Sequence, residues 1–176
     1  LSLDWGFVKP GVCGFWALHD GHAYREDEYV FTRTNAFDVG KEIARRCKTA
    51  GYTDIGYLVF DTAMETPEHD TGETTIETLR RGLRAGGVPI PTRPADKERL
   101  NGWQRVRHWL SLAPDGAPWL QSSPRCAYFN RTLPALISDP HKPEDVWSDG
   151  EDHAADDTRY FCMSRPAPET KPFGTV

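Results

Sequence analysis

The spacing of apolar and polar residues predicts that the chain opens with three strands. Residues 1–7 form the first apolar-rich run, and two more, 12–19 and 22–31, flank the dipeptide Asp20-Gly21. An Asp-Gly pair between two such runs is a strong signal for a tight hairpin. Residues 9–11, Lys-Pro-Gly, supply the turn before it. The opening therefore predicts three consecutive antiparallel strands.

Helices and shorter strands alternate through the middle of the chain. Helical spacing of apolar residues predicts helices at residues 36–50, 74–85, 96–112 and 123–133. Asn35 is the expected N-cap of the first, and Ser123-Pro124 has the composition of a helix start. Residues 55–61 are typical of a buried strand that ends on an aspartate. The runs at 88–92 and 118–120 contain or adjoin proline, which favours edge strands.

The last predicted helix carries a dense group of acidic residues. Its apolar stripe consists of Ala154, Ala155, Thr158, Phe161 and Cys162. Asp152 and Asp156 share the face away from that stripe, and Asp157 lies at its margin. A solvated helix capped by Asp149 would account for Glu151 and Asp152, because acids suit a first helical turn. It does not account for Asp156 and Asp157, which repel each other in the second turn.

Length and composition indicate one folded domain. The 176 residues are 38% hydrophobic, which is enough to form a hydrophobic core, and we assign the folded domain to residues 1–164. The tail at 165–176 holds three prolines and no periodicity, so we expect it to be extended or disordered. No apolar run has the length of a membrane span, and no signal peptide is visible. The four cysteines are scattered and form no Cys-x-x-Cys pair, so neither a zinc knuckle nor a disulfide framework is indicated, and a reducing cytoplasm is the simplest setting.

The sequence begins without methionine, already inside a strand, so we interpret it as part of a longer polypeptide. It contains no Gly-x-x-x-x-Gly-Lys-Ser/Thr loop and so no recognisable ATPase site. Its net charge of −5 argues against tight unaided binding to DNA, since phosphate contacts dominate that affinity. Bound cations would offset part of the negative charge, so we expect weak, salt-sensitive DNA affinity.

Three aspartates on separate elements suggest a metal site. Asp4 lies in the first strand, Asp61 ends the strand at 55–61, and Asp156 lies on the late helix. Hard oxygen ligands that converge beside a sheet suit Mg²⁺ or Mn²⁺. Asp152 and Asp157 are candidates for auxiliary ligands. His153 is expected to make a structural hydrogen bond, and His69, in the polar loop at 62–72, is the other histidine considered as a ligand.

The chain resembles the nuclease domain of the large terminase subunit of tailed bacteriophages. The matching stretches, in order, are Leu-Asp-Trp-Gly at 3–6, Val-Phe-Asp at 59–61, Asn-Gly-Trp at 101–103, and the acidic block with Arg-Tyr at 143–160. The resemblance implies an α/β, ribonuclease H-like fold with a mixed sheet of three antiparallel and then parallel strands, flanked by helices. It also implies an endonuclease that cuts concatemeric double-stranded DNA with two Mg²⁺ or Mn²⁺ ions, with Asp4 as the bridging ligand.

The resemblance extends to partners and to the late ligand. It implies an N-terminal ATPase domain in the full subunit, a portal protein, a small terminase subunit, and action at the procapsid portal in the host cytoplasm. We expect the isolated domain to be monomeric and to have no membrane partner. Asp157 stands where the family more usually has a small apolar residue, which leaves the choice between Asp156 and Asp157 open; the helical wheel favours Asp156.

Two other functional classes fit part of the pattern. One is a ribonuclease H-like resolvase or integrase-type nuclease, against which the Asn-Gly-Trp stretch at 101–103 and the pair Arg159-Tyr160 argue. The other is a non-catalytic module that docks to DNA or the portal. Intact Asp4, Asp61 and Asp156 argue against such a loss of function.

Overall fold

The computed structural model describes residues 1–67, 72–147 and 150–168. Within these ranges the chain forms a mixed sheet with the strand order β5-β4-β1-β2-β3-β6. The strands are β1 (Ser2–Asp4), β2 (Gly11–His19), β3 (His22–Phe31), β4 (Leu58–Phe60), β5 (Thr92–Pro94) and β6 (Leu120–Ser122). β1, β2 and β3 pair antiparallel, whereas β4, β5 and β6 join the sheet as parallel strands. This is the predicted ribonuclease H-like arrangement.

The β2–β3 hairpin confirms the strongest local signal in the sequence. Asp20 and Gly21 both have positive φ, 48° and 82°, as the tight turn between twisted strands requires. The first strand is shorter than predicted. It ends at Asp4, after which the chain leaves the sheet for a loop at residues 5–10.

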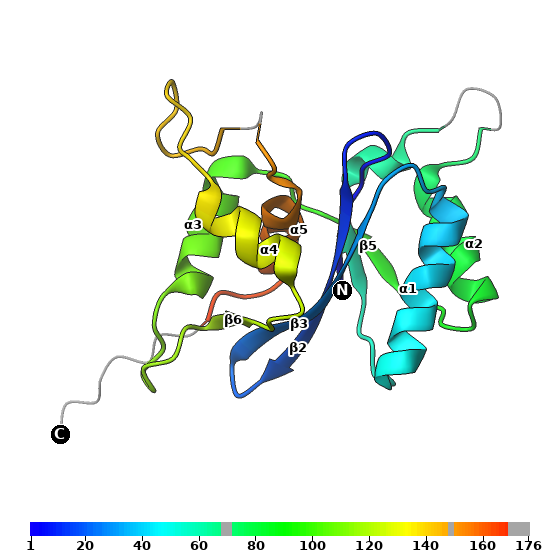
Figure 1. Ribbon diagram of the computed structural model, residues 1–176, viewed down its shortest axis with the longest axis horizontal. Coiled ribbons are helices and arrows are strands. Elements are labelled where there is room, and N and C mark those ends of the chain that lie inside the picture. Colours follow the sequence, from blue (N-terminus) through cyan, green and yellow to red (C-terminus); the bar gives the residue numbers. More distant parts are fainter. Residues whose placement is uncertain (68–71, 148–149, 169–176) are drawn as a thin grey trace.

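Two helices cover one face of the sheet (Figure 1), α1 (Ala36–Ala50) and α2 (Thr75–Ala85). Both begin at side-chain caps: Asn35, as predicted, accepts from the Asp38 amide, and Thr74 forms a reciprocal capping box with Glu77. The helices cross closely at Gly40 and Gly82, where an added Cβ would lie 2.4 and 2.1 Å from backbone oxygens of the other helix. Glycine is therefore required at this crossing.

The opposite face is covered by three helices (Figure 1): α3 (Arg99–Leu110), α4 (Ala127–Thr132) and α5 (His153–Met163). The stripe predicted for α5 is buried, and Phe161 within it stacks on Trp16 with ring centroids 4.0 Å apart. Trp103 and Trp109 of α3 are also buried, as expected for core residues and not for base-stacking surfaces.

Several predicted boundaries were wrong. The helix expected from residue 123 begins at Ala127, because Ser123 opens a turn in which its carbonyl accepts from the Cys126 amide at 3.0 Å. The edge strands expected at 88–92 and 118–120 pair two to four residues further along, at β5 and β6. Both are edge strands, as predicted.

Some predictions concern residues that the structure does not describe or describes in part. The proposed cap Asp149 and the candidate ligand His69 lie outside the described residues. Residues 165–168 have no regular secondary structure, and the rest of the tail is not described. All four cysteines are free and buried. No helix in the described ranges is both long and apolar enough to cross a membrane.

Candidate active site

Parallel pairing of β1 and β4 brings two of the candidate aspartates to the same edge of the sheet. Asp4 is the last residue of β1, and Asp61 directly follows β4. Leu3 is in register with Phe60, and the Asp61 amide donates to the Leu3 carbonyl at 3.0 Å. Asp4 and Asp61 are only 6% and 7% exposed. Two acidic side chains with little access to water therefore end adjacent strands.

Helix α5 presents a third group of polar side chains to Asp4. His153 Nδ1 lies 3.0 Å from Asp4 Oδ2, and the Tyr160 hydroxyl donates to Asp4 Oδ1 at 3.3 Å. Asp156 lies three residues after His153 and four before Tyr160, so it shares their face of the helix. The helix therefore directs Asp156 toward the edge that carries Asp4 and Asp61.

Negative charge accumulates at this edge. Burial raises the pKa of Asp4 to about 7; the hydrogen bond with His153 opposes the rise, and the charges of Asp156 and Asp61 add to it. Burial also raises the pKa of Asp152, and the charge of Asp156 adds to that rise. The hydrogen bond to Asp4 raises the pKa of His153. A divalent cation would relieve this repulsion.

Each of the three aspartates is held by a protein donor. Asp61 Oδ1 accepts from Lys97 Nζ at 2.6 Å and from the Ala63 amide at 3.0 Å. Asp156 Oδ1 accepts from Arg159 Nε and Nη2 at 3.1 and 3.0 Å. In the described part of the chain, no three His, Cys, Asp or Glu side chains form a ready metal-binding group. The Oδ2 atoms of Asp61 and Asp156 accept no hydrogen bond from a described residue, which leaves an oxygen of each available to a cation.

Asp152 keeps its place among the candidate ligands. It occupies the N-cap position of α5, is 7% exposed and makes no side-chain capping bond. Its position one turn before Asp156 places the two carboxylates on the same helix face, as the sequence predicted.

Asp157 is engaged elsewhere, which argues against the predicted role of an auxiliary ligand. It is fully buried, and its carboxylate accepts from Arg25 Nη1 at 2.7 Å and from the Ser2 hydroxyl at 3.1 Å. Burial raises the pKa of Asp157 to about 6, and the charge and hydrogen bond of Arg25 oppose that rise. A carboxylate whose two oxygens are held by a buried guanidinium and a hydroxyl is a poorer candidate for a metal ligand than one with a free oxygen. The geometry therefore favours Asp156 over Asp157.

The stretch at 101–103, to which the sequence assigned no role, packs against the Arg159 side chain. An added Cβ on Gly102 would lie 2.6 Å from Arg159 Cδ. The Arg159 guanidinium lies 5.5 Å from the centroid of the Trp103 ring, and Trp103 Nε1 donates to Asp145 at 2.9 Å. These contacts confine Arg159, which in turn holds Asp156.

Lys97 and Arg25 are site-related residues that sequence reasoning missed. Lys97 follows β5, which pairs parallel to β4 and so reaches the same edge. Arg25 lies in β3 and is completely buried. For both Lys97 and Arg25, the sequence showed only a basic residue close to an apolar run, which does not indicate a role at the site.

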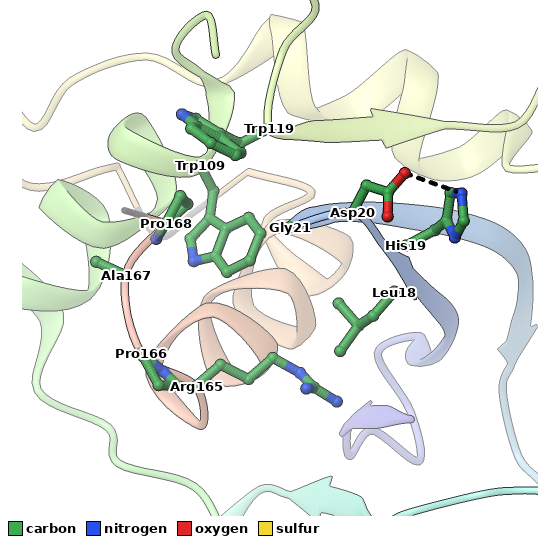
Figure 2. Close-up of a pocket in the computed structure, with 10 residues that line it drawn as sticks. All are labelled: Leu18, His19, Asp20, Gly21, Trp109, Trp119, Arg165, Pro166, Ala167 and Pro168. Atoms are coloured by element: carbon green, nitrogen blue, oxygen red, sulfur yellow. Dashed lines mark ion pairs between the residues drawn. The ribbon is translucent and has the colours of Figure 1, made fainter. Parts of the chain in front are cut away.

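A pocket of about 520 Å³ lies at the other end of the β2–β3 hairpin (Figure 2). Its lining comes from the hairpin tip, from α3, from Trp119 just before β6, and from residues 165–168, and it includes Leu18, Trp109 and Pro168. The one carboxylate in its lining, Asp20, is exposed and pairs with His19. The pocket is therefore separate from the acidic edge of the sheet.

No family model matches the chain, and no curated protein matches it by sequence. Solved structures match its fold. The large terminase of a thermophilic bacteriophage superposes with a TM-score of 0.68 at 18% identity, covering 93% of this chain and 38% of that one. The nuclease domain of the bacteriophage SPP1 large terminase, solved with bound Mn, gives a TM-score of 0.60 at 17% identity, covering 90% of this chain and 81% of that one. The chain thus spans about 38% of the length of the thermophilic phage protein and has the fold of a large-terminase nuclease domain.

Proposed function

We propose that the chain is a metal-dependent endonuclease domain of a large terminase, which cuts concatemeric double-stranded DNA during viral genome packaging. The observation that carries the proposal is the convergence of Asp4 and Asp61, at the ends of adjacent parallel strands, with the acidic face of α5. The SPP1 nuclease domain with bound Mn supports divalent metal chemistry on this fold.

Asp4, Asp61 and Asp156 would hold two Mg²⁺ or Mn²⁺ ions, with Asp4 bridging and Asp152 as an auxiliary ligand. A pair of divalent cations supplies Lewis acidity both for attack by water on the phosphodiester and for departure of the alkoxide. All these donors are carboxylate oxygens, which suits both metals.

The surrounding residues orient the ligands. His153 and Tyr160 hold the two oxygens of Asp4, which fixes the rotation of its carboxylate. Lys97 and Arg159 each hold one oxygen of a flanking aspartate. Partners that hold metal ligands in this way typically change metal affinity or activity by about ten- to a hundredfold when they are removed.

The proposal also places the chain within a larger protein. In the full subunit an ATPase domain would precede it, and the portal protein and the small terminase subunit would be its partners at the procapsid. Two alternative functions remain to be distinguished from this proposal. A resolvase or integrase-type nuclease would have the same acidic edge, whereas a non-catalytic docking module would have the same fold but no nuclease activity.

The proposal predicts that plasmid DNA is nicked or cut only when a divalent metal is present. Mn²⁺ should support cleavage at least as well as Mg²⁺, because its coordination geometry is less demanding. The measurement is gel analysis of supercoiled plasmid incubated with the chain in Mn²⁺, Mg²⁺ or excess chelator. Undiminished cleavage in chelator would contradict the metal-dependent mechanism, and no cleavage under any of these conditions would favour a docking module.

Gly102→Ala should lower Mn²⁺-dependent cleavage by about ten- to a hundredfold. The new methyl group would displace Arg159 and so loosen its hold on Asp156. Alanine is a better helix former than glycine by up to about 1 kcal/mol, which offsets part of any loss of stability. Gly56→Ala is the matched control, because nothing lies within 4 Å of its added Cβ. Equal cleavage by the two variants would show that Arg159 does not position Asp156.

A further inference from the structure

The loop at residues 5–10 exposes two adjacent apolar side chains beside the candidate active site. Phe7 is 53% exposed and Val8 is 77% exposed. They follow Asp4 by three and four residues, so the loop leaves the same edge of the sheet that carries the aspartates. Figure 1 shows this loop, in dark blue, at the upper end of the sheet, where α5 also begins.

The loop is tightly built. An added Cβ on Gly6 would lie 2.4 and 2.5 Å from the carbonyl oxygens of Pro10 and Lys9, so the backbone closes on itself there. The Phe7 carbonyl accepts from the Arg33 amide at 2.7 Å, which ties the tip to the segment after β3. Phe7 and Val8 are thus held outward by a fixed backbone, and little ordering would be needed for them to bind a partner.

Two cations flank this tip. Lys9 lies in the loop itself, and Arg33 adjoins Phe7 through the backbone hydrogen bond. Neither side chain forms an ion pair with an acidic residue in the described ranges.

We propose that the Phe7-Val8 tip is a wedge that enters the minor groove of duplex DNA and partly unstacks the base step beside the phosphodiester to be cut. Exposed apolar side chains that act this way are typically accompanied by basic groups on the neighbouring phosphates, a role that Lys9 and Arg33 fit. The inference rests on the proposed function and deepens it. The unpaired cations beside the tip suit the phosphates that flank a base step, and the tip lies next to the acidic edge where the phosphodiester would bind.

Duplex binding in chelator at low salt tests the wedge without cleavage. The duplex carries 2-aminopurine, whose fluorescence rises on unstacking, and affinity is read by anisotropy. The double variant Phe7→Ser/Val8→Ser is compared with Leu18→Ser, which changes an apolar residue 48% exposed at the other end of β2. The double variant should bind the duplex about tenfold more weakly and give no rise in 2-aminopurine fluorescence. Leu18→Ser and the conservative Phe7→Tyr should behave as the unchanged chain.

The outcomes separate the wedge from the nuclease proposal. Unchanged affinity and fluorescence in the double variant, while the original chain still cuts plasmid with Mn²⁺, would overturn the wedge alone. A double variant that loses self-association in sedimentation but keeps its DNA affinity would assign the tip to contacts between copies and also overturn it. If the original chain neither binds nor cuts DNA, the nuclease proposal fails, and the wedge fails with it.

Discussion

Asp4→Asn is expected to reduce Mn²⁺-dependent DNA cleavage by about a thousandfold or more, while it stabilises the metal-free protein. The loss of cleavage follows from the removal of a ligand charge. The bound metal stabilises the charge that develops in the transition state by several kcal/mol, and this stabilisation is lost with the ligand. Asp61→Asn should abolish cleavage in the same way. Its effect on stability should be smaller, because its partner Lys97 is partly exposed and such pairs contribute about 0–1 kcal/mol.

The gain in stability should depend on pH. In the metal-free fold the Asp4 pKa is raised from 3.8 to about 7, so between these values the folded state holds a proton that the unfolded chain has lost. The stability of the original protein therefore falls as the pH rises through this window. Asparagine does not titrate, so Asp4→Asn should gain little at about pH 4 and gain most at and above about pH 7.

Thermal melting in chelator across this pH range measures the effect. The difference in Tm between Asp4→Asn and the original chain should grow with pH and should shrink when saturating Mn²⁺ is added, since the metal stabilises only the protein that keeps the aspartate. A large drop in Tm for Asp4→Asn at neutral pH would show that Asp4 is a structural residue.

Asp156→Asn and Asp157→Asn should fail in different ways. Asp156→Asn should lose about a thousandfold in cleavage rate at saturating Mn²⁺ with little change in Tm, because asparagine can still accept from Arg159. Asp157→Asn should lower the free energy of unfolding by on the order of 3 kcal/mol, because it removes the shorter of the two ion pairs of the buried Arg25 and leaves only the pair with Glu28 at 3.4 Å. At temperatures where it stays folded, it should keep most of its activity.

Urea unfolding and single-turnover cleavage of both variants separate the two roles. The triple variant Arg25→Met/Glu28→Gln/Asp157→Leu, which removes all three charges of the buried cluster, should recover much of the lost stability, since buried ion pairs can often be replaced by uncharged residues. If Asp157→Asn is folded but inactive and Asp156→Asn keeps its activity, the orientation assigned to α5 is wrong.

Local signals account for the parts of the fold that the sequence predicted well. The hairpin at Asp20-Gly21 and the cap at Asn35 depend on residues within a few positions of one another. Ser123-Pro124 is an equally local signal for a helix start, yet these residues form a turn and the helix begins only at Ala127. The short parallel strands β5 and β6 lie two to four residues beyond their predicted positions, because the ends of each strand are set by its partner strand and not by its own residues.

The candidate site was predictable to the extent that its chemistry interrupts an apolar pattern. Asp4 and Asp61 were visible because each ends an apolar run, and Asp156 because it faces away from an apolar stripe. Arg25 and Lys97 were not, because a basic residue in a strand or loop ordinarily faces water. Their partners, Asp157 and Asp61, are 132 and 36 residues away along the chain, and only the fold brings them together.

The most direct test is the position of bound Mn²⁺ in crystals of this chain, located by anomalous scattering. The account predicts two peaks about 4 Å apart, with Asp4 bound to both, Asp61 to one and Asp156 to the other, and with Asp157 still paired with Arg25. Mn²⁺ that binds away from Asp4, or that draws Asp157 out of its ion pair as a ligand, would contradict it.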